Sequence, residues 1–365
     1  MGVFDKGFIG GLSVENRFVR SATWEGMASE DGEVTPQLVA LMQRLAEGGT
    51  GLLIASHSYV QKVGQAGFGQ IGIHKDEMIP GLAKMTEAVH QAGGLVFAQL
   101  AHAGVHAAYR LTGMQSLSPT AMFHERGGQS AEMTKGQIDE MIEAFGAAAR
   151  RAKEAGFDGV QIHAAHGYCL SQFLSPWYNR RDDEYNGSVE NRAKPLVRAY
   201  HAVREAVGSM PVIIKINAED FIAEGAGGFT QDMMLQTAKI LQSEGLDGAE
   251  MSGSCITEKS SSTSDRLIDP KTPEDEGYYL DAARRYKNEL EMPLILVGGI
   301  RSLEVSQKIV EDETADFIAF SRPLVCEPDL VSRWRSGDTQ RSRCISCSKC
   351  RGPINAGEGI RCVIR

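Results

Sequence analysis

The chain has 365 residues, 42% of them hydrophobic, 40 glycines, and a net charge of −9 with histidine neutral. This is enough chain to bury the core of one large domain or two ordinary ones. The acidic charge and the lack of long Lys/Arg runs argue against nucleic-acid binding. No apolar run approaches the ~20 residues that cross a bilayer, and the start, MGVFDK, lacks a signal-peptide core. We therefore expect a cytoplasmic protein without nucleic-acid or membrane partners.

Short apolar or β-branched segments recur along the chain, and longer segments with helical periodicity lie between them. The predicted strands span residues 16–22, 51–56, 95–100, 158–163, 211–217, 247–252, 293–298 and 315–321. The predicted helices include residues 36–47, 80–91, 137–155, 190–207 and 232–243. Eight strand–helix units with buried strands predict an α/β protein with a closed (β/α)₈ barrel (TIM barrel) rather than an open doubly wound sheet.

The barrel is predicted to span residues 1–335, and residues 336–365 form a short Cys-rich tail. Two long segments, residues 101–136 and 253–277, follow the ends of strands and are expected to cover the catalytic face. Residues 67–72 match the dinucleotide pattern G-x-G-x-x-G, but no strand directly precedes them and no clear helix follows. We therefore do not assign a dinucleotide site to them.

Four of the seven cysteines lie close together in the tail, at Cys344, Cys347, Cys350 and Cys362. The other three are scattered, at Cys169, Cys255 and Cys326. In a reducing cytosol such a cluster is expected to hold a metal rather than to form disulfides. Four thiolates suit a tetrahedral zinc ion, and free thiols are the alternative without a metal.

Polar residues at the ends of predicted strands indicate a ligand site on the catalytic face. Lys215 lies within an apolar strand, so it is expected to pair with a buried carboxylate or to stabilise an anionic ligand ring. With Gln99, whose amide offers donors and an acceptor, it suits the pyrimidine edge of a flavin. Two turns, after the seventh and eighth strands, suit a phosphate group through their backbone N–H groups and one guanidinium. They contain Gly298, Gly299, Ser321 and Arg322.

His163, His166 and Tyr168 follow one another at the end of the fourth strand. Two N–H donors beside a phenol suit a substrate carbonyl oxygen together with general acid catalysis. A zinc site that also uses His102 is one alternative, and histidines that merely cap the next helix are another.

Three sequence segments resemble the Old Yellow Enzyme family of FMN-dependent NAD(P)H:flavin oxidoreductases. They are NRFVRSAT at 16–23, QLAHAG at 99–104 and, most specifically, HAAHGYCLSQFLSPWYNRRDDEYNGSVENR at 163–192. The GGIR and SRP turns also match, and the resemblance covers about residues 5–335. It implies FMN as the cofactor and NADH or NADPH as the reductant. The substrate would be a small α,β-unsaturated carbonyl compound whose C=C bond is reduced in a ping-pong scheme.

The resemblance also implies a role for each matching residue. The FMN-binding residues would be Ser21, Ala22, Thr23, Gln99, Lys215, Gly298, Gly299, Ser321 and Arg322. His163 and His166 would hold the carbonyl oxygen, and Tyr168 would protonate the α-carbon.

The sequence departs from the family pattern at two places. Trp24 stands where many members place Thr or Cys beside the flavin, which puts the redox potential and the substrate pocket in question. The tail spacing C-x₂-C-x₂-C-x₁₁-C resembles the 4Fe–4S motif of the 2,4-dienoyl-CoA reductase branch, with one residue fewer between the second and third cysteines. A 4Fe–4S cluster, zinc and free thiols all remain alternatives for the tail.

Two other functions are alternatives to the ene-reductase. The first is a metal-dependent barrel lyase without flavin, which would use His102, His163 and His166. The second is an electron-transfer or redox protein built on the Cys tail. The sequence is compatible with a homo-oligomer and does not distinguish NADH from NADPH.

Overall fold

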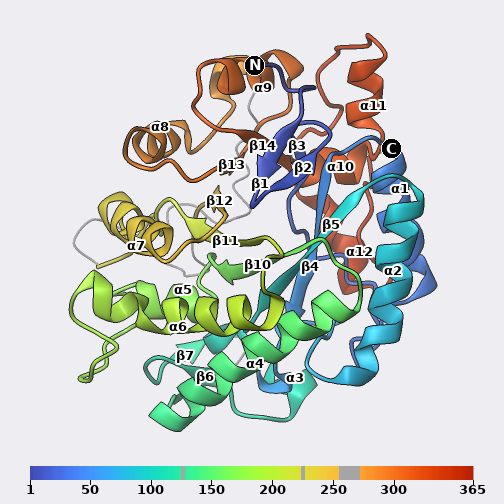
Figure 1. The fold of residues 1–365 in the computed structure, drawn as a ribbon. Helices are drawn as coiled ribbons and strands as arrows, with labels where there is room; N and C mark the ends of the chain where they lie inside the picture. The colour runs from blue at the N-terminus through green and yellow to red at the C-terminus, as the bar shows by residue number, and fades with distance from the viewer. Residues whose placement is uncertain (125–127, 223–226, 255–271, 365) are drawn as a thin grey trace.

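The computed structural model describes residues 1–124, 128–222, 227–254 and 272–364. Within these residues, eight parallel strands form a closed barrel in the order β3-β4-β5-β10-β11-β12-β13-β14, with helices around it (Figure 1). The strands are β3 (Phe18–Arg20), β4 (Leu52–Tyr59), β5 (Leu95–Ala101), β10 (Gly159–Ala164), β11 (Val212–Asn217), β12 (Gly248–Ser252), β13 (Leu294–Val297) and β14 (Phe317–Phe320). The predicted (β/α)₈ barrel is therefore confirmed.

The helices alternate with these strands along the chain, and the five helices named from periodicity are all present. The longer helices are α1 (Pro36–Glu47), α2 (Ile79–Gln91), α4 (Lys135–Glu154), α6 (Val189–Val207), α7 (Gln231–Ser243), α8 (Leu280–Glu289) and α9 (Leu303–Glu311). The short ones are α3 (Tyr109–Thr112), α5 (Cys169–Leu174), α10 (Arg322–Cys326), α11 (Leu330–Arg335) and α12 (Gly352–Asn355). Residues 67–72 have no strand directly before them and no α-helix directly after them, so they lack the strand-turn-helix geometry of a dinucleotide site.

The first barrel strand is shorter than its apolar pattern predicts, because β3 begins only at Phe18. The side chain of Asn16 accepts hydrogen bonds from the backbone N–H groups of Phe18 (3.0 Å) and Gly51 (3.2 Å). These bonds hold the start of the strand in a turn instead of a ladder.

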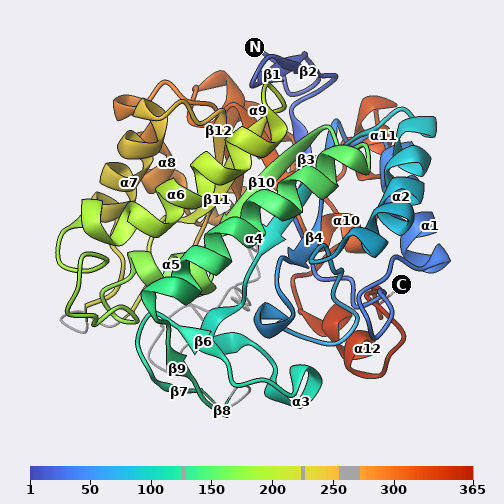
Figure 2. The same ribbon diagram turned by 60° about the horizontal axis from the view of Figure 1, so that its bottom comes forward.

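A hairpin of β1 (Gly7–Ile9) and β2 (Leu12–Val14), which the periodicity did not predict, lies at the end of the barrel opposite α12 (Figure 2). Ile9 and Val14 pack into one cluster with the inward-facing apolar side chains of the barrel, including Phe97, Ile213 and Phe317. The hairpin therefore covers one end of the barrel interior, and the polar side chains occupy the other.

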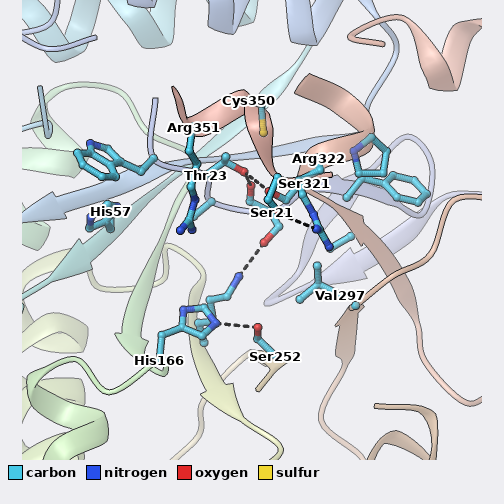
Figure 3. Close-up of a pocket in the computed structure, with 18 of the residues that line it drawn as sticks. Ser21, Thr23, His57, His166, Ser252, Val297, Ser321, Arg322, Cys350 and Arg351 are labelled. Carbon is cyan, nitrogen blue, oxygen red and sulfur yellow. Dashed lines mark hydrogen bonds between the residues drawn. The ribbon is translucent and has the colours of Figure 1, made fainter. Parts of the chain in front are cut away.

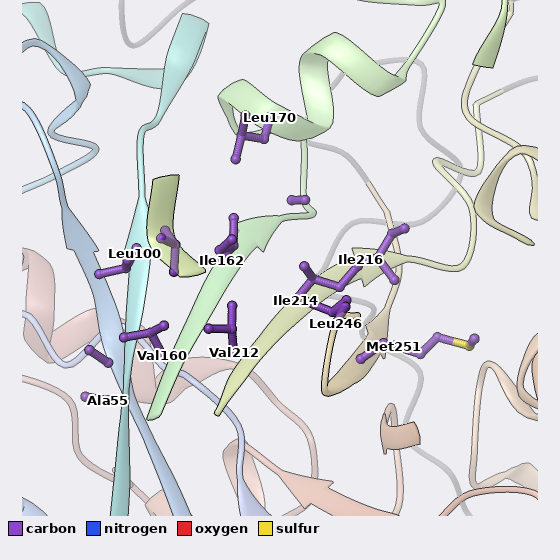
Figure 4. Close-up of a cluster of buried hydrophobic side chains, with 14 of the residues drawn as sticks. Ala55, Leu100, Val160, Ile162, Leu170, Val212, Ile214, Ile216, Leu246 and Met251 are labelled. Atoms are coloured by element: carbon purple, nitrogen blue, oxygen red, sulfur yellow. The ribbon is translucent and has the colours of Figure 1, made fainter. Parts of the chain in front are cut away.

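Outward-facing strand side chains pack against the helices and form the larger apolar core. Figure 4 shows part of it, including Ile162 of β10, Ile214 of β11 and Leu170 of α5. Because both faces of each strand are buried in this way, the strands read as continuous apolar segments rather than as an alternating pattern.

The segment after β5 contains α3 and four short strands, which pair as β6 (Leu117–Ser118) with β9 (Ala131–Glu132) and β7 (Phe123–His124) with β8 (Gly128–Gln129). It lies at the end of the barrel where the strands terminate (Figure 2), as predicted for residues 101–136. The second predicted loop and Cys255 fall mostly or wholly on residues 255–271, outside the described part of the chain. In the described ranges no helix has the length and apolar character needed to span a membrane.

Candidate active site

A main cavity of about 360 Å³ opens where the barrel strands end (Figure 3). Its volume is within the range of roughly 300–1,000 Å³ that is usual for small-molecule and cofactor sites. All the predicted FMN-binding and catalytic residues line it, namely Ser21, Ala22, Thr23, Gln99, His163, His166, Tyr168, Lys215, Gly298, Gly299, Ser321 and Arg322. The fold thus brings residues of six strand ends into one place, and their individual roles stay predictions.

A buried polar network borders this cavity. Nζ of Lys215 lies 2.7 Å from Oε1 of Glu250 and 2.7 Å from Oγ of Ser21. Gln161 donates to the other carboxylate oxygen of Glu250 at 2.8 Å and accepts from the Gln99 amide at 2.6 Å. Lys215 therefore pairs with a core carboxylate, as one expectation had it, and it also lines the cavity.

Glu250 and Gln161 complete this network, although the sequence patterns did not single them out. Both are fully buried, and neither lines the main cavity. A signal was present, since β10 has polar residues two apart at Gln161 and His163, and β12 at Glu250 and Ser252. A spacing of two within a buried strand places both residues on the same face, which here is the barrel interior.

The rings of His163, His166 and Tyr168 lie together at the end of β10. The ring centroids are 5.2 Å apart for the two imidazoles and 4.8 Å apart for His163 and Tyr168. Nε2 of His166 lies 2.7 Å from Oγ of Ser252, whereas Nδ1 of His163 is buried with no hydrogen-bond partner in the described residues. A buried imidazole nitrogen in this state is available to a ligand oxygen. In the described part of the chain, the N-cap residue of α5, Tyr168, makes no side-chain capping hydrogen bond, and the His166 ring pairs with Ser252 instead, so helix capping does not account for this segment.

His57 of β4 joins this group, and the sequence patterns did not predict it. Its Nε2 lies 3.2 Å from the phenol oxygen of Tyr168, and its Nδ1 lies 3.3 Å from Oγ of Ser56. The pairing of β4 with β5 shifts register between Ile54 and His57. Irregularities of this kind change the direction of side chains near active sites. They cannot be predicted from the periodicity of the sequence.

The three imidazoles of the cavity are uncharged near neutral pH. Burial, followed by the charge of Arg351, lowers the pKa of His57 to about 4. Burial also holds the pKa of His163 and of His166 well below the usual value, and the charge of Lys215 contributes in both cases. A neutral imidazole has one N–H donor and one acceptor nitrogen, so the site offers hydrogen bonds rather than positive charge at this point.

The two turns predicted to bind a phosphate, after β13 and β14, both line the cavity. Gly299 has a φ of 72° and packs so closely against Tyr278 that a side chain there would overlap the ring. Ser321 lies 2.8 Å from the hydroxyl of Thr23. Arg322 donates through Nη1 to two tail residues, at 3.1 Å each, which are Ser346 and Ser348.

A second cavity, of about 230 Å³, is lined by all four predicted ligand cysteines, and we call it the cysteine cavity. Cys326 of α10 also lines it and hydrogen-bonds to Cys362, although it lies outside the tail. Burial raises the pKa of Cys326 to about 12 and raises those of Cys344 and Cys350. As free groups these thiols are therefore protonated at neutral pH, and a bound metal or cluster would have to stabilise their thiolates.

The two cavities share a wall, because Arg322, Ser348 and Cys350 line both of them. A group bound in the cysteine cavity would therefore lie next to a ligand in the main cavity.

In the described ranges, no three His, Cys, Asp or Glu side chains are placed to hold one metal ion. His102, the third ligand of the alternative zinc site, does not line the main cavity, and its Nδ1 accepts from the backbone of Gly104 at 3.1 Å. The four tail cysteines instead surround a space, whereas zinc needs all its sulfurs ~2.3 Å from one point.

Polar residues from several strand ends meet in one cavity of the barrel, and this arrangement is typical of (β/α)₈-barrel enzymes. The chain belongs to the NADH:flavin oxidoreductase / NADH oxidase family, whose model matches residues 6–340. The resemblance to Old Yellow Enzymes is therefore confirmed, and the protein is an oxidoreductase. The family's name and its members imply a flavin cofactor and a nicotinamide reductant.

Two relatives differ in how much of their length this chain covers. The 4,4'-dithiodibutanoate disulfide reductase of Rhodococcus erythropolis is 32% identical, over 100% of this chain and 95% of its own length. The NADH oxidase of Thermoanaerobacter brockii is 34% identical over 95% of this chain, but this covers only 52% of the relative. The chain thus spans about half the length of this second relative.

Solved structures show the same barrel. A 2-naphthoyl-CoA reductase superposes with a TM-score of 0.91 at 25% identity, over 100% of this chain and 57% of that one. The Old Yellow Enzyme homologue of Zymomonas mobilis gives a TM-score of 0.79 at 25% identity, over 93% of this chain and 94% of that one.

Proposed function

We propose that the protein is an FMN-dependent ene-reductase that uses NADH or NADPH to reduce the C=C bond of α,β-unsaturated carbonyl compounds. The observation that carries this proposal is the convergence of His163, His166 and Tyr168 on one cavity that also contains Lys215 and Gln99. Hydrogen-bond donors for an oxygen and a phenolic proton donor thus lie beside the groups suited to a flavin edge.

The residues present fit FMN. Lys215 and Gln99 would hold the pyrimidine edge of the ring, and both are already oriented by Glu250 and Gln161. Arg322 would bind the phosphate, together with the hydroxyl of Ser321 and the turn at Gly298 and Gly299. When bound, FMN supplies hydride transfer, from the nicotinamide to the flavin and then to the β-carbon of the substrate.

The chain's own residues supply the remaining chemistry. His163 and His166 would donate hydrogen bonds to the carbonyl oxygen, which makes the β-carbon electrophilic and stabilises the developing enolate. For His166, Ser252 can donate to Nε2 and leave the proton of the ring on Nδ1. The phenol of Tyr168 would give its proton to the α-carbon. Nε2 of His57, 3.2 Å from the phenol oxygen, can accept the hydrogen bond of this phenol.

We further propose a 4Fe–4S cluster in the cysteine cavity, ligated by Cys344, Cys347, Cys350 and Cys362. The four thiols that line that cavity and the wall that it shares with the main cavity support this assignment. The cluster would supply one-electron transfer, and Cys350 would be its ligand nearest to the main cavity.

A two-step experiment tests the ene-reductase. The purified protein is reconstituted with FMN, reduced anaerobically with one equivalent of NADH or NADPH, and mixed with 2-cyclohexenone, cinnamaldehyde or a 2-enoyl-CoA. We expect reoxidation of the flavin absorbance and one equivalent of saturated product with at least one of these compounds. A protein that binds no FMN, or a reduced flavin that none of the three reoxidises, would refute the proposal.

Disulfide reduction is a second candidate, and the full-length match to the dithiodibutanoate disulfide reductase favours it. That match covers the tail as well as the barrel. The same reduced protein mixed with 4,4'-dithiodibutanoate decides between the two. Formation of two thiols per flavin, at a rate above that with any enone, would favour the disulfide.

A further inference from the structure

The tail is anchored to the barrel beside the main cavity. Ile360 donates through its backbone N–H to the carbonyl of Glu25 at 2.8 Å. Ile354 of α12 packs so closely against Gly26 that a side chain at that glycine would overlap it. Arg351 directly precedes α12, so these contacts determine where its side chain enters the cavity.

The anchoring point is itself held by the barrel. Glu25 forms an ion pair with Arg20 of β3, with 2.6 Å between Oε1 and Nη2, and both side chains are at most 2% exposed. Pairs of this kind are costly to break. The position of Arg351 therefore depends on the barrel core and not only on the tail.

The main cavity is lined by basic side chains, and none of its described lining residues is Asp or Glu. The basic residues are Lys215, Arg301, Arg322 and Arg351. Lys215 has Glu250 as a counter-ion, Arg301 donates to the backbone carbonyl of Cys344, and Arg322 donates to Ser346 and Ser348. Of these three, Lys215 and Arg322 belong to the predicted FMN site, whereas Arg301 binds the tail backbone.

Arg351 lies toward the reacting groups instead. Figure 3 shows its side chain reaching from the tail into the cavity, on the side of His57. Its charge lowers the pKa of His57 and of His166, although burial is the larger cause in both. The side chain of Arg351 lines the cavity and the residue is also exposed to solvent.

We infer that Arg351 is a specificity-determining residue that binds a carboxylate of the substrate, close to the electrophilic group held by His163 and His166. The inference rests on the proposed function for what these histidines hold. A guanidinium presents two parallel N–H donors that match a carboxylate. The neutral imidazoles provide no competing charge, and no lining carboxylate of the described residues repels the anion.

The test compares two ligands that differ in charge but hardly in shape, 4-hydroxybenzoate and 4-hydroxybenzamide. Each is titrated into the oxidised FMN-loaded protein, and the dissociation constant follows from the change in flavin absorbance. Arg351→Gln should weaken binding of the carboxylate about fivefold, as suits a partly exposed ion pair, and leave binding of the amide unchanged. Arg351→Lys should fall between these results.

Lys349→Gln is the matched control, because Lys349 is an exposed cation two residues away that lines neither cavity. It should keep the wild-type ratio of the two dissociation constants. An unchanged ratio in Arg351→Gln, an equal loss for both ligands, or a loss confined to NADH binding would each overturn the inference. If neither phenol perturbs the flavin, the ratio of kcat/KM for 3-benzoylacrylate and its amide decides in the same way.

The measurements distinguish a failure of the ene-reductase proposal from a failure of the role proposed for Arg351. FMN content and reduction of the neutral 2-cyclohexenone are measured for each variant alongside the titrations. A shift in the ratio in a protein whose wild type reduces none of 2-cyclohexenone, cinnamaldehyde and the 2-enoyl-CoA would refute the ene-reductase and support carboxylate binding by Arg351. Enone reduction with an unchanged ratio would overturn only the role of Arg351.

Discussion

The phenol oxygen of Tyr168 lies 3.2 Å from Nε2 of His57. Because burial and the charge of Arg351 lower the pKa of His57 to about 4, this imidazole is neutral at pH 7 and Nε2 can accept the phenolic hydrogen bond. The acceptor orients Tyr168 beside His163, whose ring centroid is 4.8 Å away. A proton donor from the end of β10 is thus positioned by a residue of β4.

Replacement of Tyr168 by Phe should separate the two half-reactions. It removes the proton donor and keeps the ring, so reduction of the alkene should slow about 100-fold, as is usual for loss of a general acid. Reduction of bound FMN by NAD(P)H should stay within about twofold, because that step needs no proton from the phenol. Anaerobic stopped-flow absorbance measures both rates. Equal losses in both steps would contradict the assigned role.

His102 should make the stability of the protein depend on pH. Burial lowers its pKa from 6.5 to about 4, so between these pH values the unfolded chain binds a proton that the folded chain does not. The free energy of unfolding should therefore fall by up to about 3 kcal/mol as the pH drops from 6.5 toward 4. We expect a shallower fall in His102→Gln.

Urea unfolding of the wild type and of His102→Gln at pH 7 and pH 4.5, at equal FMN concentration, measures this difference. His102 does not line the main cavity, so the comparison does not depend on ligand binding there. Parallel pH curves for the two proteins would show that His102 is not the titrating group.

Glu250→Gln should destabilise the fold strongly, because it leaves the charge of Lys215 without its partner at 2.7 Å in the barrel interior. Loss of one partner of a buried pair costs roughly 3–5 kcal/mol. The double variant with Lys215→Met should recover part of this loss. The measurement is urea unfolding of both variants under the same conditions.

Glu15→Gln is the control for that comparison. Glu15 pairs with Lys6 at 2.8 Å, but both side chains are well exposed, so the cost should stay below about 1 kcal/mol. A similar cost for Glu250→Gln and Glu15→Gln would mean that the interior pair is not essential to the fold.

Cys347→Ser should abolish the iron content that we expect in anaerobically purified protein, because each cubane iron needs its own thiolate. Cys326→Ser should retain it, since Cys326 lines the same cavity but is not a predicted ligand. Iron and acid-labile sulfide per chain, with the visible spectrum, measure this. Loss of iron in Cys326→Ser would require a different ligand set, and zinc without iron in the wild type would refute the cluster.

The order of the elements was predictable because buried strands and amphipathic helices have different periodicities. The pattern predicted α1 within its observed bounds, since Thr35 caps its start and Pro36 suits its first turn. Elements without such signals were missed. The β1–β2 hairpin is only three residues per strand, and its inward face is recognisable only once the barrel end that it covers is known.

The site residues also divide into those that a local sequence pattern indicates and those that only tertiary contacts place. His163, His166 and Tyr168 form one local segment, and Lys215 stands out among apolar neighbours, so the sequence alone indicated them. His57 depends on a register shift between two strands, and Arg351 depends on contacts of the tail with residues more than 300 positions earlier, Ile360 with Glu25 for example. No local pattern encodes either relationship.

The sequence by itself determined the barrel, the family and the residues suited to FMN, because these follow from periodicity and from short segments whose spacing is local. Only the tertiary structure decided which of these groups meet. It paired Lys215 with Glu250, set His57 against Tyr168, brought Cys326 to the tail cysteines and placed Arg351 in the main cavity. The physical reason is that barrel closure and tail docking bring together side chains far apart in the chain, and burial then changes their charge states.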